Sequence, residues 1–309
     1  MQFGIAYPNL VDGDEIRRFA IHTESLGFES IWAGDHIVLP VGRTHGYPYS
    51  ADGSFQRPSD VPFMEPFTLL SFIGSVTTRI RIGTTVIIVP YRHPVVQAKM
   101  LACLDVLTGG RAICGVGVGW LRKEFETLDA PYEQRGPMTD EYLEIFKCLW
   151  TEPLPSYQGR FHQISEITFE PKPIQKPHIP IWVGGHSRAA VRRAVRYADA
   201  WHPTRQTPEQ VADMLPYLRE HARELGRDPD QILISLKRAL HFTDLGLAEG
   251  GNPLAAGTLV GTARQVLDDI KRCQDLGIRQ VTFDFRTANY DECIRVIEHL
   301  AEQVMARLR

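Results

Sequence analysis

Hydrophobic positions along this chain alternate between short continuous runs and stripes with helical spacing. The runs are rich in β-branched residues, which is typical of strands buried on both faces of a parallel sheet. We expect eight such strands, at residues 1–7, 30–36, 80–88, 112–117, 179–183, 199–202, 232–237 and 280–285. Each run is followed by a segment whose apolar residues recur every three to four positions, as in an amphipathic helix.

Helix-terminus signals support this division of the chain. Acidic residues at 12–15 and Gly27 bound the first helix, Pro94 opens another, and Thr262 with Gln265 forms a capping box. The stripes expected to face the core are Ile16, Phe19, Ala20 and Leu26; Val96, Met100, Leu104 and Leu107; Tyr142, Ile145, Phe146 and Leu149; and Val266, Leu267, Ile270 and Cys273.

Eight strand–helix units predict an α/β fold, a TIM (β/α)8 barrel formed by residues 1–309 as a single domain. A doubly wound open sheet would show the same alternation. Two insertions interrupt the pattern: residues 40–62 after the second strand, and residues 153–177 before the fifth, with a hairpin around 161–169. Loops of this length in compact domains are usually lids or binding loops.

Composition narrows the class of protein. The chain is 43% hydrophobic and 23% charged with a net charge of −3, and no long run of Lys or Arg points to nucleic acid. No segment approaches the roughly 20 apolar residues that span a membrane. Residues 1–7 read as a strand instead of a signal peptide, so we expect a cytoplasmic protein whose five widely spaced cysteines are reduced. No metal-binding spacing is present, and we expect no metal.

The segment Gly34-Asp35-His36 places two ionisable side chains at the end of the second strand. In a parallel barrel, the carboxyl ends of the strands are where chemistry is done. Asp35 and His36 are therefore the first candidates for catalytic residues. The alternative is that Asp35 caps the next segment and His36 lies on the surface.

Two glycine-rich strand ends are candidate ligand contacts. The run Gly115–Gly119 lacks the spacing of a dinucleotide fingerprint, and its small residues would either let a flat ligand approach or serve the curvature of the barrel. Gly184 and Gly185 precede a helix that starts near Ser187, where free N–H groups can bind an anion. An ordinary turn in which Ser187 caps the helix is the alternative.

Aromatic residues suggest an apolar wall and lid for a substrate pocket. Trp120 follows the fourth strand, the first insertion carries Tyr47, Tyr49 and Phe55, and Phe63 comes directly after it. Arg238 and Arg286 follow the last two strands and could meet an anion. We interpret them as structural residues held in salt bridges.

The chain resembles the bacterial luciferase-like flavin and deazaflavin oxidoreductases over nearly its whole length. The segments that carry the resemblance are Ser30–His36, Arg81–Val86, Pro90–Pro94, Gly109–Arg111, Gly115–Trp120 and Pro180–Gly185. The family fold is a TIM barrel, in agreement with the strand–helix pattern, and family members are often dimers. The resemblance therefore implies a homodimer that acts on a small-molecule substrate.

Within that family, the chain looks most like the branch that uses the deazaflavin coenzyme F420. Members of this branch place an Asp-His pair beside the reactive ring, which matches Asp35 and His36, and carry a non-proline cis peptide that would fall at Thr85-Val86. A sugar-phosphate dehydrogenase of this branch has an acidic proton donor where Trp120 stands, which suggests a more apolar substrate here. The cofactor contacts implied by these matches are Asp35, Thr84, Thr85, Val86, Gly117, Val118, Gly119, Gly184, Gly185 and Ser187.

The activity expected from this resemblance is hydride transfer between F420 and a small organic substrate. His36 would give or take the accompanying proton, since histidine titrates near neutrality, and Asp35 would orient His36 or bind the cofactor. The helix start at Gly184-Gly185-Ser187 would bind the cofactor phosphate. Trp120, Tyr47, Tyr49 and Phe55 would line the substrate pocket.

Three alternatives stay open. The nearest is a monooxygenase of the same family that uses reduced FMN and oxygen. A non-catalytic flavin-binding barrel would have its pocket filled by side chains. A metal-dependent hydrolase would need Asp35, His36, His202 and Asp284 to converge on a metal, although the first strand lacks an H-x-H motif.

Overall fold

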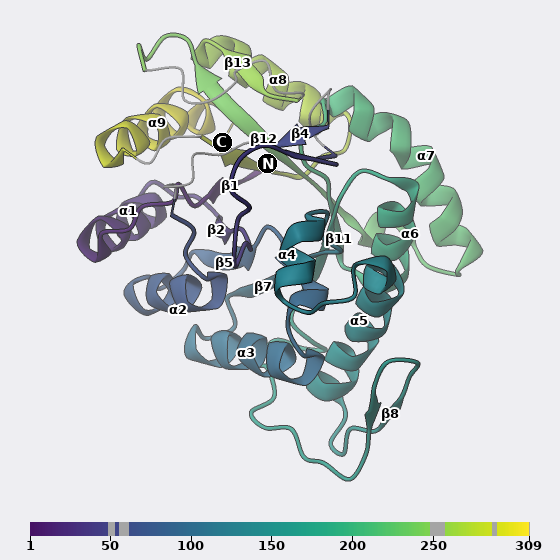
Figure 1. The fold of residues 1–309 in the computed structure, drawn as a ribbon. Coiled ribbons are helices and arrows are strands. Elements are labelled where there is room, and N and C mark those ends of the chain that lie inside the picture. Colours follow the sequence, from purple (N-terminus) through teal and green to yellow (C-terminus); the bar gives the residue numbers. More distant parts are fainter. Residues whose placement is uncertain (49–52, 56–61, 248–256, 286–288, 309) are drawn as a thin grey trace.

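The computed structural model describes residues 1–48, 53–55, 62–247, 257–285 and 289–308. Eight parallel strands close into a ring because β10 pairs with both β11 and β7. The strands, in ring order, are β10 (Ile181–Gly184), β11 (Ala200–His202), β12 (Leu233–Phe242), β14 (Gln280–Asp284), β1 (Gln2–Ala6), β2 (Ser30–Ala33), β5 (Arg81–Thr84) and β7 (Ala112–Gly117). Helices surround the ring (Figure 1), and the predicted TIM barrel is confirmed. That residues 1–309 act as one domain stays a prediction.

The surrounding helices follow the predicted order. They are α1 (Gly13–Ser25), α2 (Pro66–Val76), α3 (Pro94–Leu107), α5 (Arg135–Thr151), α6 (Arg188–Tyr197), α7 (Pro208–Glu224), α8 (Ala263–Asp275) and α9 (Tyr290–Gln303). Asp12 caps α1, and Thr262 with Gln265 forms the predicted capping box of α8. None of the helices in the described ranges is long and apolar enough to cross a membrane. All five cysteines are free thiols.

The predicted core stripe of α3 is wrong. Val96 and Leu107 are 54% and 75% exposed, and only Leu104 of the expected four is buried. The buried face of the helix consists instead of Gln97, Ala98, Leu101, Ala102, Leu104 and Asp105. Small and polar residues therefore face inward on this helix, and hydrophobicity alone selects the wrong side. The stripes of α5 and α8 are confirmed as buried.

The predicted strand at residues 80–88 is interrupted. It forms β5, a bulge that contains the cis peptide Thr85-Val86, and then β6 (Ile87–Ile88), which pairs with β7. The cis peptide lies where the family resemblance implied it. The seventh barrel strand is longer than expected, since β12 runs to Phe242 and also pairs with β13 (Leu259–Gly261).

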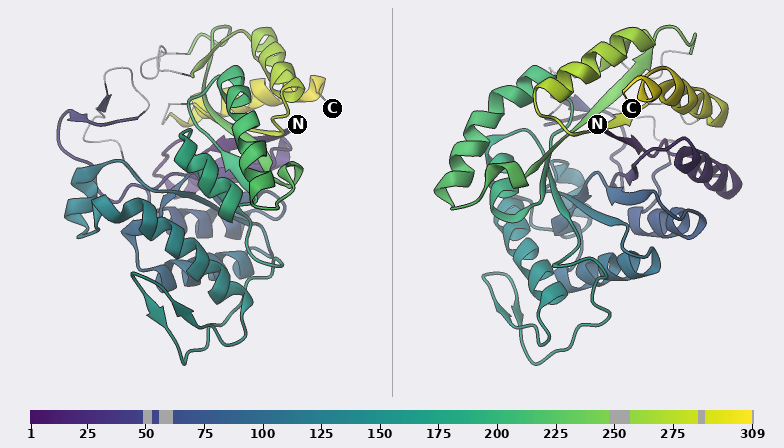
Figure 2. Two further views of the ribbon diagram at one scale, coloured as in Figure 1. Left: turned by 90° about the vertical axis from the view of Figure 1, so that its right-hand side faces the viewer. Right: turned by 180° about the vertical axis from the view of Figure 1, so that it is seen from behind.

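Each of the two insertions forms a small hairpin outside the barrel sheet. The first contains the hairpin of β3 (Thr44–His45) and β4 (Ser54–Phe55), on the same side of the barrel as the short helix α4 (Arg122–Thr127) (Figure 2). The second contains the hairpin of β8 (Tyr157–Gln158) and β9 (Gln163–Ile164), which starts before the predicted range. Four short 3-10 helices complete the described part: η1 (Val89–Tyr91), η2 (Tyr132–Gln134), η3 (Pro229–Gln231) and η4 (Met305–Arg307).

The bulge after β5 explains the glycines at the neighbouring strand ends. A Cβ atom at Gly115 would overlap the carbonyl oxygen of Thr84, and one at Gly117 would stand 2.5 Å from Val86 Cγ2. A Cβ at Gly184 would approach Val86 from the other side, at 2.8 Å from Cγ1. These glycines therefore make room for the chain's own bulge, which is a third explanation beside ligand approach and barrel curvature.

We expect Gly115→Ala to destabilise the fold by about 3 kcal/mol or more, because its new methyl group meets backbone that cannot rotate away. Gly13→Ala is the matched control, since no atom lies within 4 Å of its Cβ position at the exposed start of α1. Urea unfolding of both variants measures the difference. Equal stability of the two variants would contradict the packing of the bulge on β7.

Candidate functional site

Asp35 is a buried carboxylate that ties the end of β2 to the segment after β6. Its side chain has no exposed surface, and both oxygens accept from Arg92, at 2.7 Å from Nη1 and 2.9 Å from Nη2. The backbone N–H of Ile88 donates to Oδ2 at 2.9 Å. Burial works to lower the pKa of Arg92, but Asp35 and Glu65 outweigh burial and raise it. Arg92 therefore keeps its charge, and the pair fixes the loop that carries His36.

His36 is hydrogen-bonded to Glu124. Its Nδ1 lies 2.8 Å from Oε2 of Glu124, a carboxylate whose side chain is fully buried. The backbone N–H groups of Ile37 and Val38 donate to Oε1 at 2.6 and 3.2 Å. Because an ionised carboxylate only accepts hydrogen bonds, the proton of His36 belongs on Nδ1. This leaves Nε2 as the imidazole atom that can exchange a proton.

This contact changes the predicted role of Asp35. Among the residues that the structure describes, the hydrogen bonds of Asp35 go to Ile88 and Arg92, and the residue that orients His36 is Glu124. The sequence reasoning missed Glu124 because it followed the acidic position of the sugar-phosphate enzyme to Trp120. A signal was available: Glu124 interrupts the apolar positions Leu121 and Phe125, which are both buried.

Tyr91 supplies a further hydrogen bond to Glu124, from its hydroxyl to Oε2 at 2.9 Å. Burial is the largest cause that raises the pKa of Tyr91, and the charge of Glu124 adds to it. The hydroxyl therefore stays protonated and donates. Glu124 thus accepts from the His36 ring, the Tyr91 hydroxyl and two backbone amides, which holds its position tightly.

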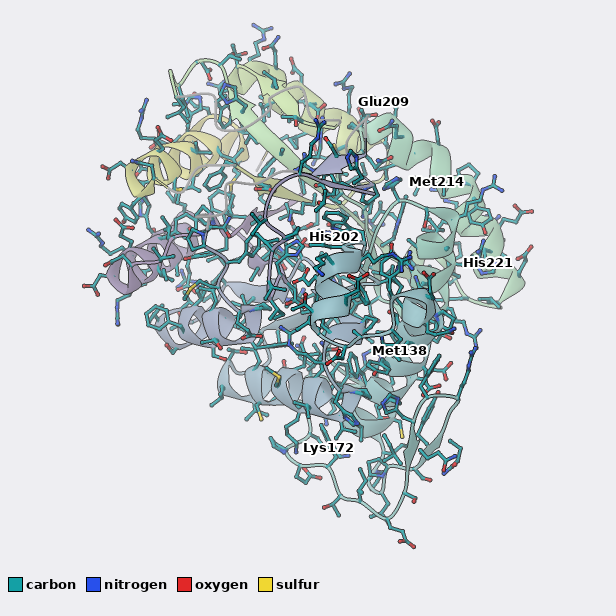
Figure 3. The ribbon with its side chains drawn as sticks, in the orientation of Figure 1. Met138, Lys172, His202, Glu209, Met214 and His221 are labelled. Atoms are coloured by element: carbon teal, nitrogen blue, oxygen red, sulfur yellow. The ribbon has the colours of Figure 1, made fainter. Side chains whose placement is uncertain are left out.

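A second hydrogen-bonded chain fixes the bulge from inside the barrel. Ser235 Oγ donates to Gln280 Oε1, so it accepts from His202 Nδ1, which is 2.7 Å away. The Nε2 atom of His202 is then an acceptor and lies 3.1 Å from the Thr85 hydroxyl. Burial, and next the charge of Lys237, lower the pKa of His202 to about 3, so the ring is neutral. His202, labelled in Figure 3, ends β11, and its ring stacks inside the barrel on that of Trp32 from β2, with centroids 5.1 Å apart.

The remaining candidates are brought to the same end of the barrel. Thr84 is fully buried and donates to the carbonyl of Gly115 at 2.7 Å, while Lys237 Nζ lies 3.4 Å from the Thr85 carbonyl. Val118 and Gly119 follow β7, and the positive φ of Gly119, 80°, suits glycine. These contacts hold the bulge in place, and direct cofactor contacts stay a proposal.

Two of the candidate phosphate-binding residues at the start of α6 already form hydrogen bonds within the chain. Ser187 accepts from the Ala190 N–H as the N-cap of the helix, as in the alternative interpretation. Gly185 has a φ of 96°, and its carbonyl accepts from Trp201 Nε1 at 2.8 Å. The N–H groups that Ser187 does not cap could still take an anion.

The first insertion reaches the site through aromatic contacts. Tyr47 packs edge-on against Trp120 with ring centroids 4.9 Å apart, and Phe63 packs against His36 at 5.2 Å. That Trp120 lines a substrate pocket stays a prediction. Tyr49, the side chain of Phe55, and Arg286 lie outside the described residues. Arg238 pairs with Asp269, as expected for a structural arginine.

Removal of Arg92 should leave Asp35 buried without a counter-charge. We expect Arg92→Met to lower the free energy of unfolding by about 3–5 kcal/mol, and the double variant with Asp35→Asn to lose less than the sum of the single variants. Arg122→Met is the control: its partner is Glu133, both side chains are more than half exposed, and the expected loss is at most about 1 kcal/mol. Additive losses in the double variant would show that the pair is not coupled.

Comparisons with known proteins show which proteins this chain resembles. A sequence model described as luciferase-like monooxygenase matches residues 1–245. An uncharacterised protein of Mycobacterium tuberculosis is 32% identical over 295 residues, which cover 92% of each chain. An F420-dependent glucose-6-phosphate dehydrogenase of Microbacterium testaceum is 30% identical over 74% of this chain and 65% of its own. An FMNH(2)-dependent dimethylsulfone monooxygenase of Pseudomonas putida is 29% identical over 70% and 55%.

Solved structures show the same fold at low sequence identity. The monooxygenase RslO1 from Streptomyces bottropensis superposes over the full length of both chains with a TM-score of 0.79 and 22% identity. A coenzyme F420-dependent tetrahydromethanopterin reductase from Methanopyrus kandleri gives 0.77 and 18% identity, over 100% of this chain and 99% of its own. Members of the matched family are oxidoreductases or monooxygenases. The chain belongs to the luciferase-like monooxygenase family.

Proposed function

We propose that this protein is an oxidoreductase that uses coenzyme F420 and a small organic substrate, with His36 as its proton-transfer residue. The observation that carries the proposal is the His36–Glu124 pair, held at the carboxyl ends of the barrel strands beside the Thr85-Val86 bulge. A relative that is 30% identical depends on F420, which favours this cofactor. The sugar-phosphate substrate of that relative is not carried over to this chain.

The residues present suit a flat ring. Among the described residues, only Phe63 and the Thr85 carbonyl lie within 4 Å of a Cβ position at Gly34, at 3.6 and 3.9 Å, so the backbone beside Asp35 is approachable. Thr85 and Val86 would form the surface under the ring, with Val118, Gly119 and Trp120 at its edge. Gly184, Gly185 and Ser187 would hold the phosphate. A bound deazaflavin supplies hydride transfer; the protein supplies orientation and exclusion of water.

The protein's own contribution to the reaction is proton transfer at His36 Nε2. Glu124 keeps the other nitrogen protonated and balances the positive charge that His36 gains when it accepts a proton. Asp35 and Arg92 keep the loop from moving. Trp120 and the first insertion would exclude water from the reacting atoms. Assembly as a homodimer and a cytoplasmic location also stay proposals.

An FMN-dependent monooxygenase is the second candidate, since the dimethylsulfone monooxygenase that resembles this chain depends on reduced FMN. The two candidate functions can be distinguished by the cofactor that the protein binds. We expect a fluorescence titration with F420 to give a micromolar dissociation constant and FMN to bind far more weakly. The reverse preference would replace the proposal with the monooxygenase, and binding of neither would contradict both.

We expect His36→Ala to lower kcat by roughly 10²–10⁴-fold while the dissociation constant of the cofactor stays close to that of the unmodified protein. The loss follows from removal of the proton-transfer group. The assay is stopped-flow cofactor oxidation or reduction with an acceptor found in a screen of carbonyl and unsaturated compounds. His93→Ala, an exposed residue outside the Glu124 pair, is the control. Full turnover in His36→Ala at saturating cofactor would remove His36 from the mechanism.

A further inference from the structure

Arg205 is a buried arginine with no carboxylate partner among the residues that the structure describes. It follows β11 and is only 9% exposed. Its Nη1 atom has no hydrogen-bond partner, and no carboxylate in the described ranges lies within ion-pair distance of its guanidinium. A buried charge without a partner is strongly unfavourable. Such a group is retained where it meets a partner that is not part of the chain.

Other buried arginines of this protein do have partners. Arg92 pairs with both oxygens of Asp35, and Arg238 pairs with Asp269. In each of these two pairs the guanidinium faces a buried carboxylate. Arg205 has no such carboxylate in the described ranges, and it follows β11 at the carboxyl ends of the barrel strands, where a partner could come from solution.

The surroundings of Arg205 place it near the bulge. Its backbone N–H donates to the carbonyl of Lys237 at 3.1 Å, and the ammonium of Lys237 reaches the Thr85 carbonyl. A Cβ atom at Gly257 would overlap the backbone of Arg205, so the chain at Gly257 packs directly on this residue and covers it. Arg205 itself has a φ of 56°, a left-handed conformation that is uncommon for arginine.

The order of the strands places Arg205 opposite the loop that carries Asp35 and His36. Counted around the ring, β11 and β2 are four strands apart, which makes them opposite each other. Lys237 lies on β12, next to β11, but its ammonium reaches across to the Thr85 carbonyl in the bulge. A substrate with its reacting atoms at His36 that spans the barrel mouth would therefore extend towards Arg205.

We propose that Arg205 binds an oxyanion of the substrate, a carboxylate or phosphate group, at the β11 side of the barrel mouth. The inference rests on the proposed function, because it names the substrate class of the same site. The planar guanidinium offers a pair of donors that matches both anions. The Lys237 ammonium on the neighbouring strand adds favourable charge. A phosphate of the cofactor has the same chemistry and is the second source that the experiment distinguishes.

The first experiment measures Tm of the full chain in sodium phosphate and in sodium acetate, each against sodium chloride at equal ionic strength. We expect phosphate or acetate to raise Tm saturably by a few degrees, and we expect Arg205→Met to abolish this response. Arg205→Lys, which keeps the charge but not the planar fork, should respond at higher anion concentration. No response of the unmodified protein to either anion, or an equal response in Arg205→Met, would overturn the proposal.

The ligand-free variants provide a second criterion. Removal of an unpartnered buried charge should leave Tm unchanged or raise it, so Arg205→Met should melt at or above the unmodified protein. Arg238→Met is the matched control and should melt lower, because it leaves Asp269 buried alone. If Arg205→Met melts as low as Arg238→Met, or does not fold, Arg205 is a structural residue and the proposal is wrong.

Cofactor titrations separate the two sources of the anion. If Arg205 binds the substrate, Arg205→Met binds F420, FMN and riboflavin as the unmodified protein does. If the variant loses affinity for FMN but not for riboflavin, which lacks the phosphate, the anion belongs to the cofactor and the substrate assignment is overturned. Failure of the unmodified protein to bind any of the three would contradict the proposed function, while the response to phosphate and acetate still decides the role of Arg205.

Discussion

The buried ion pair between Asp35 and Arg92 is the interaction on which the geometry of this site depends. Its two carboxylate oxygens connect the end of β2 with η1, which follows the bulge and β6. His36 is the next residue after Asp35, and Tyr91 is the residue before Arg92. Both of those neighbours reach Glu124. One ion pair therefore positions two of the donors that hold the buried Glu124 carboxylate.

Carboxylates that accept from backbone N–H groups recur as anchors of loops in this barrel. Glu24 accepts from three consecutive residues, Thr78–Ile80, at the start of β5, and Glu141 accepts from three others, 160–162, in the second insertion. Glu124 does the same for Ile37 and Val38. Each bond satisfies amides that no strand or helix would pair, so loops between elements become fixed without an apolar core of their own. The second insertion and the candidate site are thus held by the same kind of interaction.

The barrel was predictable from the sequence because its strands are continuous apolar runs and its helices carry capping residues. The capping box of α8 and the stripe of α5 are local patterns, and they are confirmed. The α3 stripe could not be chosen correctly, since Gln97 and Asp105 face the interior and Leu107 faces outward. Periodicity locates a helix, but it does not say which face meets the barrel when polar residues are buried.

The site was predictable only where it follows a strand. Asp35 and His36 stand directly after β2, so position alone singled them out, whereas the partner of His36 comes from α4, 88 residues away in sequence. His202 could be placed at a strand end, but its role depends on Ser235 from β12 and on Thr85 from the bulge after β5. Pairings of this kind arise from closure of the ring and leave no spacing in the sequence.

Local pairing allows acidic and basic side chains to lie close together at the carboxyl ends of the barrel strands. Asp35 is neutralised by Arg92 and Glu124 is satisfied by four donors, so neither carboxylate needs the cations on the opposite side. His202, which lies between the two sides, is neutral because burial prevents its protonation. The ammonium of Lys237, on β12, lies 3.4 Å from the Thr85 carbonyl in the bulge. Arg205 follows β11, opposite the end of β2 that carries His36, so an asymmetric substrate that contacted both residues would be held in one orientation.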